Sequence, residues 1–91
     1  MKIIKLDNRF TMYKAGYTHA MRWPRWEPRI ITPYEEAMGK MYGENWYTKG
    51  SPWTMQFGSK SKSDEYTPYY IYVMCESMLT MLLLRVKNES N

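Results

Sequence analysis

Apolar and polar positions alternate along the N-terminal quarter of the chain, which is the pattern of strands with one buried face. Residues 1–6, 10–14 and 17–23 are each expected to form a strand. The short segment 7–9 between the first two is rich in turn-forming residue types. A three-residue loop there keeps the apolar side chains of both strands on one face. The pattern therefore predicts a three-stranded antiparallel meander.

The clearest helix signal lies in the middle third of the chain. Thr32 is an N-cap residue type, Pro33 suits the first helical position, and Glu35 completes the spacing of a capping box. Gly43 is the residue type that most often follows the end of a helix. We therefore expect a short helix over residues 33–42 that packs on the sheet through a stripe of apolar side chains.

Four segments of the C-terminal half carry further signals. Residues 53–57 alternate apolar and polar types and predict a strand. Residues 59–65 are polar throughout, as in a surface loop. Residues 69–75, rich in Tyr with Ile and Val, predict a buried strand. Residues 78–86 fit either a helix or a returning strand, and helix is favoured because a hairpin would have to turn at two residues that rarely adopt positive φ.

Tyrosines in the buried strand are expected to divide between its two faces. Because strand side chains alternate, Tyr70 and Tyr72 share one face, while Tyr69, Ile71 and Val73 share the other. One of these faces is a candidate aromatic platform, although it lacks the glycine-aromatic signature of the ribonucleoprotein type.

Together these elements predict a single small α+β domain over residues 1–91. Its antiparallel sheet has four to five strands, with the helix 33–42 packed on it and a C-terminal helix or strand at 78–86. A chain of this length buries only a thin core. Its apolar residues are unusual, with nine Met and 16% aromatic residues against twelve Ile, Leu and Val. Such side chains fill cores and are also enriched at binding surfaces.

The net charge of +4 is concentrated in the N-terminal third, which contains seven Lys and Arg residues and only two acidic residues. Such a bias favours acidic partners, mainly by speeding their encounter with the protein. Solubility explains a charge of this size equally well.

Catalytic candidates are sparse. One His and one Cys exclude an intramolecular disulfide and the usual zinc ligand sets. His19 and Cys75 could serve as base and nucleophile, but no catalytic signature surrounds either residue. We therefore expect a protein that is not an enzyme and has no metal or cofactor. The single cysteine and a charged N-terminus favour the cytoplasm, and no apolar stretch is long enough to span a membrane.

Cations and large aromatic residues interleave most densely at residues 22–29, on a backbone stiffened by two prolines. Trp and Arg anchor many protein interfaces, and they also stack on bases and contact phosphates. The polar loop at 59–65 adds two lysines that would steer a partner. The expected contact residues are Arg22, Trp23, Arg25, Trp26, Arg29, Lys60 and Lys62. The alternative is that both tryptophans belong to the core and the arginines shield them from solvent.

No motif assigns the chain to a family. In size and composition it resembles small phage or mobile-element proteins that act by occupying a host protein. The leading hypothesis is an anti-defence type of inhibitor that docks on a host protein or nucleoprotein complex in the host cytoplasm. The second hypothesis is direct binding of single-stranded nucleic acid through Trp stacking and Arg or Lys contacts with phosphate. A homo-oligomer paired through a sheet face and an enzyme are the remaining classes, and no membrane partner is expected.

Overall fold

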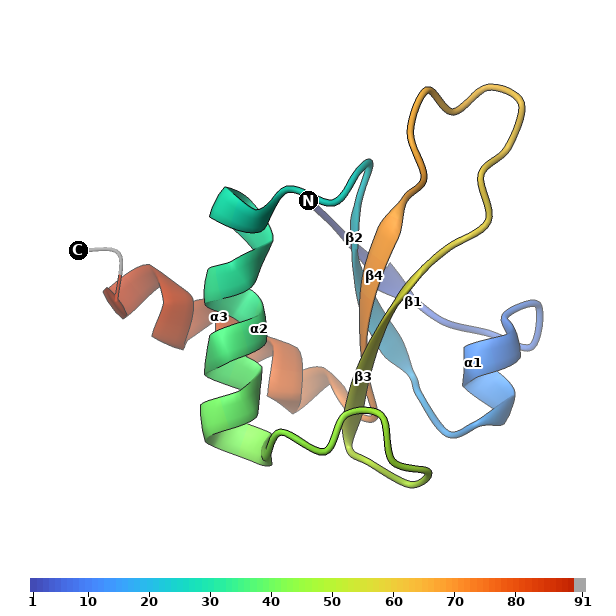
Figure 1. Cartoon of the computed structure of the whole chain (residues 1–91). Helices are drawn as coiled ribbons and strands as arrows, with labels where there is room; N and C mark the ends of the chain where they lie inside the picture. The colour runs from blue at the N-terminus through green and yellow to red at the C-terminus, as the bar shows by residue number, and fades with distance from the viewer. Residues whose placement is uncertain (90–91) are drawn as a thin grey trace.

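The computed structural model of this chain describes residues 1–89 (Figure 1). Within these residues, four strands form one antiparallel sheet in the order β1-β2-β4-β3, accompanied by three helices. The strands are β1 (Lys2–Lys5), β2 (His19–Trp23), β3 (Trp53–Phe57) and β4 (Tyr69–Val73). The helices are α1 (Thr11–Lys14), α2 (Pro28–Tyr42) and α3 (Glu76–Glu89). The predicted α+β class is confirmed.

The sheet separates two apolar cores. Helices α2 and α3 lie on one face of the sheet, and the segment containing α1 lies on the other (Figure 1). The main core fills the space between sheet and helices and contains Met21, Trp23, Ile31, Ala37, Met38, Trp53, Tyr69, Ile71, Val73, Met78, Leu79 and Leu82. The smaller core on the α1 side contains Leu6, Tyr17, Ala20 and Tyr72. Strand alternation therefore divides the β4 tyrosines between the two faces as predicted.

Strands β2 and β4 occupy the centre of the sheet, while β1 and β3 form its edges. The pairing register places Ile3, Met21, Ile71 and Met55 in one row across the four strands. The two central members of this row are fully buried, whereas Ile3 on the edge strand is about half exposed. Along this row burial thus falls toward both edges, since Met55 is partly and Ile3 about half exposed.

The predicted strand at residues 10–14 is wrong. Residues 11–14 form the single turn α1, and β1 pairs directly with β2. The turn is closed by the backbone N–H of Tyr17, which donates to the carbonyl of Met12 over 3.1 Å. The apolar side chains of Phe10 and Met12, which produced the alternating pattern, pack against the smaller core instead. Alternation over so few residues does not distinguish a strand from a segment that covers the second face of a sheet.

Helix α2 begins earlier than predicted and ends where expected. It starts at Pro28, which takes the first helical position, and it is followed by Gly43 with a φ of +93°. The additional turn carries Ile31, which is completely buried in the main core. Burial of this side chain outweighs the capping signal at Thr32. Pro33 therefore lies inside the helix, where its nitrogen has no hydrogen to donate to the preceding turn.

The C-terminal elements follow the sequence pattern. The predicted strands are present as β3 and β4, and residues 78–86 lie within the helix α3. Met78, Leu79 and Leu82 are buried, at the spacing of one helix face. Over residues 1–89, no helix has both the length and the apolar character needed to cross a membrane.

Candidate functional site

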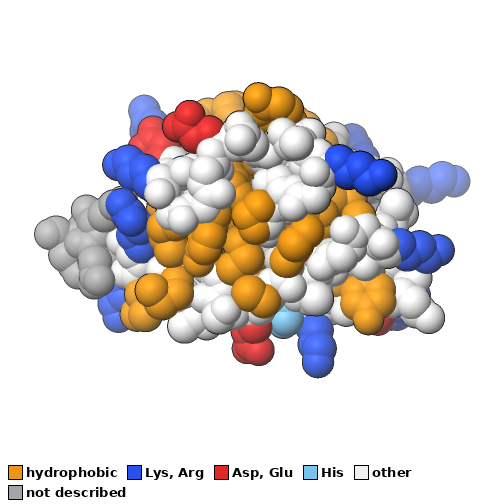
Figure 2. Space-filling model, turned by 90° about the horizontal axis from the view of Figure 1, so that it is seen from below, with side chains coloured by type: hydrophobic (Ala, Val, Ile, Leu, Met, Phe, Trp, Pro, Cys, Tyr) orange, Lys and Arg blue, Asp and Glu red, His pale blue; other side chains and the backbone are white. Residues whose placement is uncertain are grey.

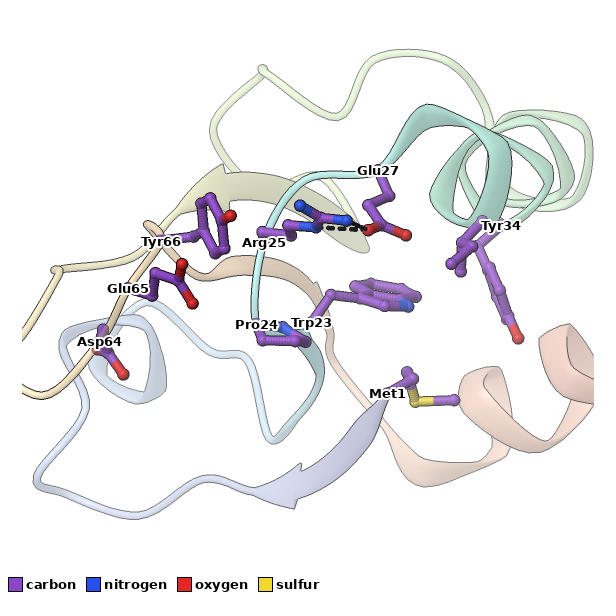
Figure 3. Close-up of a pocket in the computed structure, with 10 residues that line it drawn as sticks. Met1, Trp23, Pro24, Arg25, Glu27, Tyr34, Asp64, Glu65 and Tyr66 are labelled. Carbon is purple, nitrogen blue, oxygen red and sulfur yellow. Dashed lines mark hydrogen bonds and ion pairs between the residues drawn. The ribbon is translucent and has the colours of Figure 1, made fainter.

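Two loops meet at one end of the sheet and carry most of the predicted contact residues. The first connects β2 to α2 and spans residues 24–27, and the second connects β3 to β4 and spans residues 58–68. Figure 3 shows the Arg25 guanidinium between Tyr66 of the second loop and Glu27 of the first. The guanidinium carbon lies 5.0 Å from the centre of the Tyr66 ring, a cation–π contact that joins the two loops.

A groove of about 500 Å³, the two-loop groove, lies between these loops (Figure 3). Its apolar lining includes the exposed side chains of Met1, Ile30 and Tyr66. The buried ring of Trp23 also lines it, and its charged lining consists of Glu27, Asp64 and Glu65 together with Arg25. The groove is therefore apolar with a margin of three carboxylates and one guanidinium, in a chain that is basic as a whole.

Asp64 is held in the second loop by local hydrogen bonds. Its carboxylate accepts the backbone N–H of Ser61 over 3.0 Å and the hydroxyl of Ser61 over 2.9 Å. These hydrogen bonds lower the pKa of Asp64, so its carboxylate is charged at neutral pH. The acidic margin of the two-loop groove is thus a fixed feature of the loop.

Trp26 belongs to the first loop, and 44% of its surface is exposed. A second groove, of about 710 Å³, has Trp26, Arg29, Phe57 and Tyr66 in its lining, beside the ion pair of Arg25 and Glu27. We call Trp26, Arg29, Phe57 and Tyr66 the Trp26 surface. The rings of Trp26 and Phe57 both meet the buried ring of Tyr69 edge to face, at centroid distances of 6.5 and 5.0 Å. The buried Tyr69 ring therefore supports the exposed rings of Trp26 and Phe57 through edge-to-face contacts.

The prediction that Trp23 presents its ring outward is wrong. Trp23 is 3% exposed and packs edge to face on Tyr34 at 5.3 Å, so it belongs to the main core. It is the last residue of β2, and alternation places it on the same side as Met21, toward the helices. The core interpretation of this tryptophan is correct, whereas Trp26, beyond the strand, remains partly exposed.

Arg22 is also separated from the Trp26 surface, because neighbouring strand residues point to opposite faces. Its Nε donates to the hydroxyl of Tyr70 over 3.2 Å, and its guanidinium lies 3.9 Å from the carboxylate of Asp64. The Tyr70 ring in turn stacks on Tyr72 at 5.4 Å. Arg22 thus connects the α1 side of the sheet to the second loop.

The remaining predicted residues lie at the same end of the molecule. Arg25 is ion-paired with Glu27, and Arg29 is exposed in the first turn of α2. Lys60 and Lys62 are exposed on the second loop, which lies at the top of Figure 1. The structure therefore groups Arg25, Trp26 and Arg29 and places the two lysines on a neighbouring loop.

Ile30, Phe57 and Tyr66 belong to this region but were not predicted from the sequence. Phe57 is 57% exposed because it ends an edge strand beyond the cover of the helices. Its apolar alternation with Trp53 and Met55 suggests a buried position, and only the strand order shows otherwise. The aromatic residue in the otherwise polar second loop, Tyr66, was the one available signal.

The two catalytic candidates occupy ordinary surroundings. The Cys75 thiol is exposed just before α3 and lies 3.1 Å from the Ser77 hydroxyl, and this hydrogen bond lowers the pKa of the thiol. His19 lies on β2, with its Nδ1 2.8 Å from the Thr18 hydroxyl. Among the residues whose placement is described, no three His, Cys, Asp or Glu side chains gather as a metal site.

The opposite end of the molecule offers a different surface. Seen from below, hydrophobic side chains form a band across the middle of this end, and Lys and Arg side chains lie mainly toward its margins (Figure 2). This end lacks the predicted Trp and Arg cluster, which lies with the two loops at the other end (Figure 1). The two-loop end is therefore the candidate site.

Comparison with known proteins adds no family to these observations. The chain matches no protein-family model, no curated protein and no solved structure. The functional proposal therefore depends on the geometry and charge of the two-loop end.

Proposed function

We propose that this chain is a non-enzymatic binding protein that docks on a larger protein through the Trp26 surface and inhibits it, as small phage or mobile-element anti-defence proteins do. The observation that supports it most is the gathering of three exposed aromatic rings, Trp26, Phe57 and Tyr66, around one groove. Adjoining exposed apolar side chains on a small protein mark interaction sites, and Trp, Tyr and Arg are the residue types that most often anchor them.

The fixed rings strengthen this proposal. Tyr69 contacts both Trp26 and Phe57, and Arg25 holds Tyr66, so three anchors are positioned before a partner arrives. Less conformational entropy is then lost on binding. We place this activity in the cytoplasm, of a host cell if the chain is phage-encoded, because a lone cysteine suits a reducing compartment.

The charges around the rings favour a protein partner over nucleic acid. Arg25 is already paired with Glu27, and two further carboxylates, Asp64 and Glu65, line the adjoining two-loop groove. Carboxylates repel phosphates, whereas mixed charges are common in protein interfaces. Burial of Trp23 also removes one of the two rings that base stacking would use. The protein face of a nucleoprotein complex is compatible with this surface.

Capture of partners from host lysate tests the proposal. Wild-type protein should recover a defined protein, and Trp26→Ala should reduce that recovery at least tenfold. Tyr13→Ala is the matched control, because Tyr13 on α1 is exposed to nearly the same extent and lies on the other side of the sheet. The recovered protein, once purified, should lose activity when wild-type chain is added but not when Trp26→Ala is added.

A second measurement addresses nucleic acid. Fluorescence anisotropy of labelled single-stranded oligonucleotides should stay flat at low salt. Binding that falls log-linearly with salt and is weakened for every sequence by Trp26→Ala would favour the nucleic-acid alternative. Capture that is the same for wild type and Trp26→Ala would exclude the Trp26 surface as the docking site.

A further inference from the structure

A third cavity, of about 450 Å³, is built from five separate parts of the chain. It is lined by Trp26 of the first loop, Glu35 of α2, Trp46 of the α2–β3 connection, Met55, Gln56 and Phe57 of β3, and Tyr69 of β4. We call this cavity the Glu35 pocket. The lining thus combines four aromatic rings, one thioether and one amide with a single carboxylate.

The aromatic rings of the Glu35 pocket are steeply inclined to one another. The Trp26 and Tyr69 planes make an angle of 66°, and the Phe57 and Tyr69 planes an angle of 71°. Rings at such angles cannot form one flat stacking platform, so they suit a compact ligand better than a planar base. The π faces of several aromatic rings around one space are the arrangement that binds organic ammonium ions.

Glu35 supplies a carboxylate that no cation of the pocket lining neutralises. Its Oε1 is buried and makes no hydrogen bond of standard geometry with residues 1–89, and the Trp26 indole is the nearby donor that acts on this carboxyl group. The described residues that line the pocket include no Lys or Arg. An unpaired buried carboxylate oxygen is unfavourable, and a bound cation would relieve that penalty.

Further carboxylates lie beside the pocket. An adjoining cavity of about 400 Å³ shares Glu35, Trp46 and Met55 with it and adds Glu36 and Glu44. Three of the nine acidic residues of a basic chain are thus gathered at this position. Their combined field attracts cations to the mouth of the pocket and repels phosphates.

We infer that the Glu35 pocket binds the alkylammonium group of a lysine side chain from a partner protein, with Trp26, Trp46 and Tyr69 around the cation and the Glu35 carboxylate neutralising it. The cation chemistry stands on the pocket alone. The assignment of the cation to a partner's lysine rests on the proposed function, because Trp26 and Phe57 line both the pocket and the groove of the Trp26 surface.

Titration with choline tests the chemistry without any partner protein. Choline should shift the indole N–H signals of Trp26 and Trp46 in a saturable way in NMR spectra. Its neutral isostere 3,3-dimethylbutan-1-ol should not shift them. Glu35→Gln should weaken choline binding at least tenfold, whereas Glu76→Gln, which removes an exposed charge at the start of α3, should leave it unchanged. Equal shifts with the neutral isostere, or an unchanged affinity of Glu35→Gln, would overturn the inference.

A second titration identifies the source of the cation. A short peptide with a central lysine should displace choline, and the same peptide with norleucine in place of lysine should not. Choline binding without displacement by the lysine peptide would overturn the lysine assignment. If Trp26-dependent capture fails while choline still binds wild type and not Glu35→Gln, the proposed function fails and the cation pocket stands.

Discussion

Glu35 combines partial burial, aromatic neighbours and an unpaired oxygen in one side chain. Burial is the main cause that raises its pKa, the nearby Glu36 carboxylate adds to the effect, and the Trp26 indole N–H acts in the opposite direction. The groups that face it from other elements are the Tyr69 phenol of β4 and Glu44 across the adjoining cavity. A raised carboxyl pKa means that the folded state holds its proton more tightly than the unfolded chain.

The stability of a Glu35→Gln variant should therefore depend on pH. Below the ordinary Glu pKa, wild type and variant should be equally stable, because Glu35 is protonated in both the folded and the unfolded state. As pH rises through the folded-state pKa, wild type loses stability and the variant does not. Thermal unfolding at neutral pH should give a higher midpoint for Glu35→Gln. A lower midpoint at neutral pH would show that the carboxylate stabilises the fold.

Cys75 offers a second residue-level prediction. The Ser77 hydroxyl is the main cause that lowers the pKa of this exposed thiol, followed by the backbone N–H of Met78. Ser77→Ala should therefore move the pH midpoint of iodoacetamide alkylation upward, because the thiolate loses a hydrogen bond. Ser59→Ala, at an exposed serine of the second loop, is the control and should leave the midpoint in place. An unchanged midpoint for Ser77→Ala would contradict the assigned hydrogen bond.

At the scale of elements, local signals identified most helices and strands but placed some boundaries wrongly. The strands 53–57 and 69–73 and the end of α2 were predictable, because alternation and Gly43 are local properties. The start of α2 was not, since it depends on the burial of Ile31 against a distant part of the chain. The alternating segment at residues 10–14 is likewise a helical turn, because its apolar side chains Phe10 and Met12 pack on the second face of the sheet.

Substitutions in the first turn of α2 test this explanation. Ile31→Ala should lower the free energy of unfolding by about 2–5 kcal/mol, because it leaves a cavity in the main core. Its neighbour Ile30 is about half exposed, and Ile30→Ala should change the free energy by less than about 0.5 kcal/mol. Thr32→Ala should also have little effect, because Thr32 lies inside the helix. A loss near 1 kcal/mol, typical of a removed N-cap, would indicate that the helix starts at Thr32 after all.

At the scale of the whole molecule, the strand order determines which side chains reach the surface. The order β1-β2-β4-β3 makes β3 an edge, and this exposes Phe57 and opens the Glu35 pocket beside it. Strand order depends on pairing between distant segments, so the local pattern of apolar and polar positions does not predict it. The sequence consequently pointed to the Trp26 loop but could not show that Trp23 is buried or that Glu35, Trp46 and Tyr69 meet.

Tyrosines on both sides of the sheet predict how the molecule responds to alkali. Burial raises the pKa values of Tyr17, Tyr69 and Tyr72 above the ordinary value of about 10, because it disfavours the phenolate. Because these phenols hold their protons more tightly in the folded state, they stabilise the fold fully at pH values below the ordinary Tyr pKa. This contribution to the free energy of unfolding is lost as pH rises through the folded-state pKa values. The urea midpoint should therefore fall steeply above pH of about 10, and tyrosinate absorbance should rise in two steps, the second coinciding with unfolding.

Tyr69→Phe is the matched variant for this measurement, since it keeps the ring and removes the ionisable hydroxyl. It should make the alkaline decline in the urea midpoint shallower, whereas Tyr47→Phe, at the most exposed tyrosine among those described, should not. A single absorbance step for all tyrosines, with the fold intact, would rule out the protection of these phenols.

Trp26 and Phe57 line both the groove of the Trp26 surface and the Glu35 pocket, so the same two rings form a partition between them. A molecule that immobilises this partition from one side removes motion that a second molecule would otherwise have to quench, so the two occupancies are energetically linked. Such linkage is reciprocal, and each occupant changes the affinity of the other by the same factor. A protein that inserts a lysine while it grips the outer rings would thus be held by two mutually reinforcing contacts on either side of one indole.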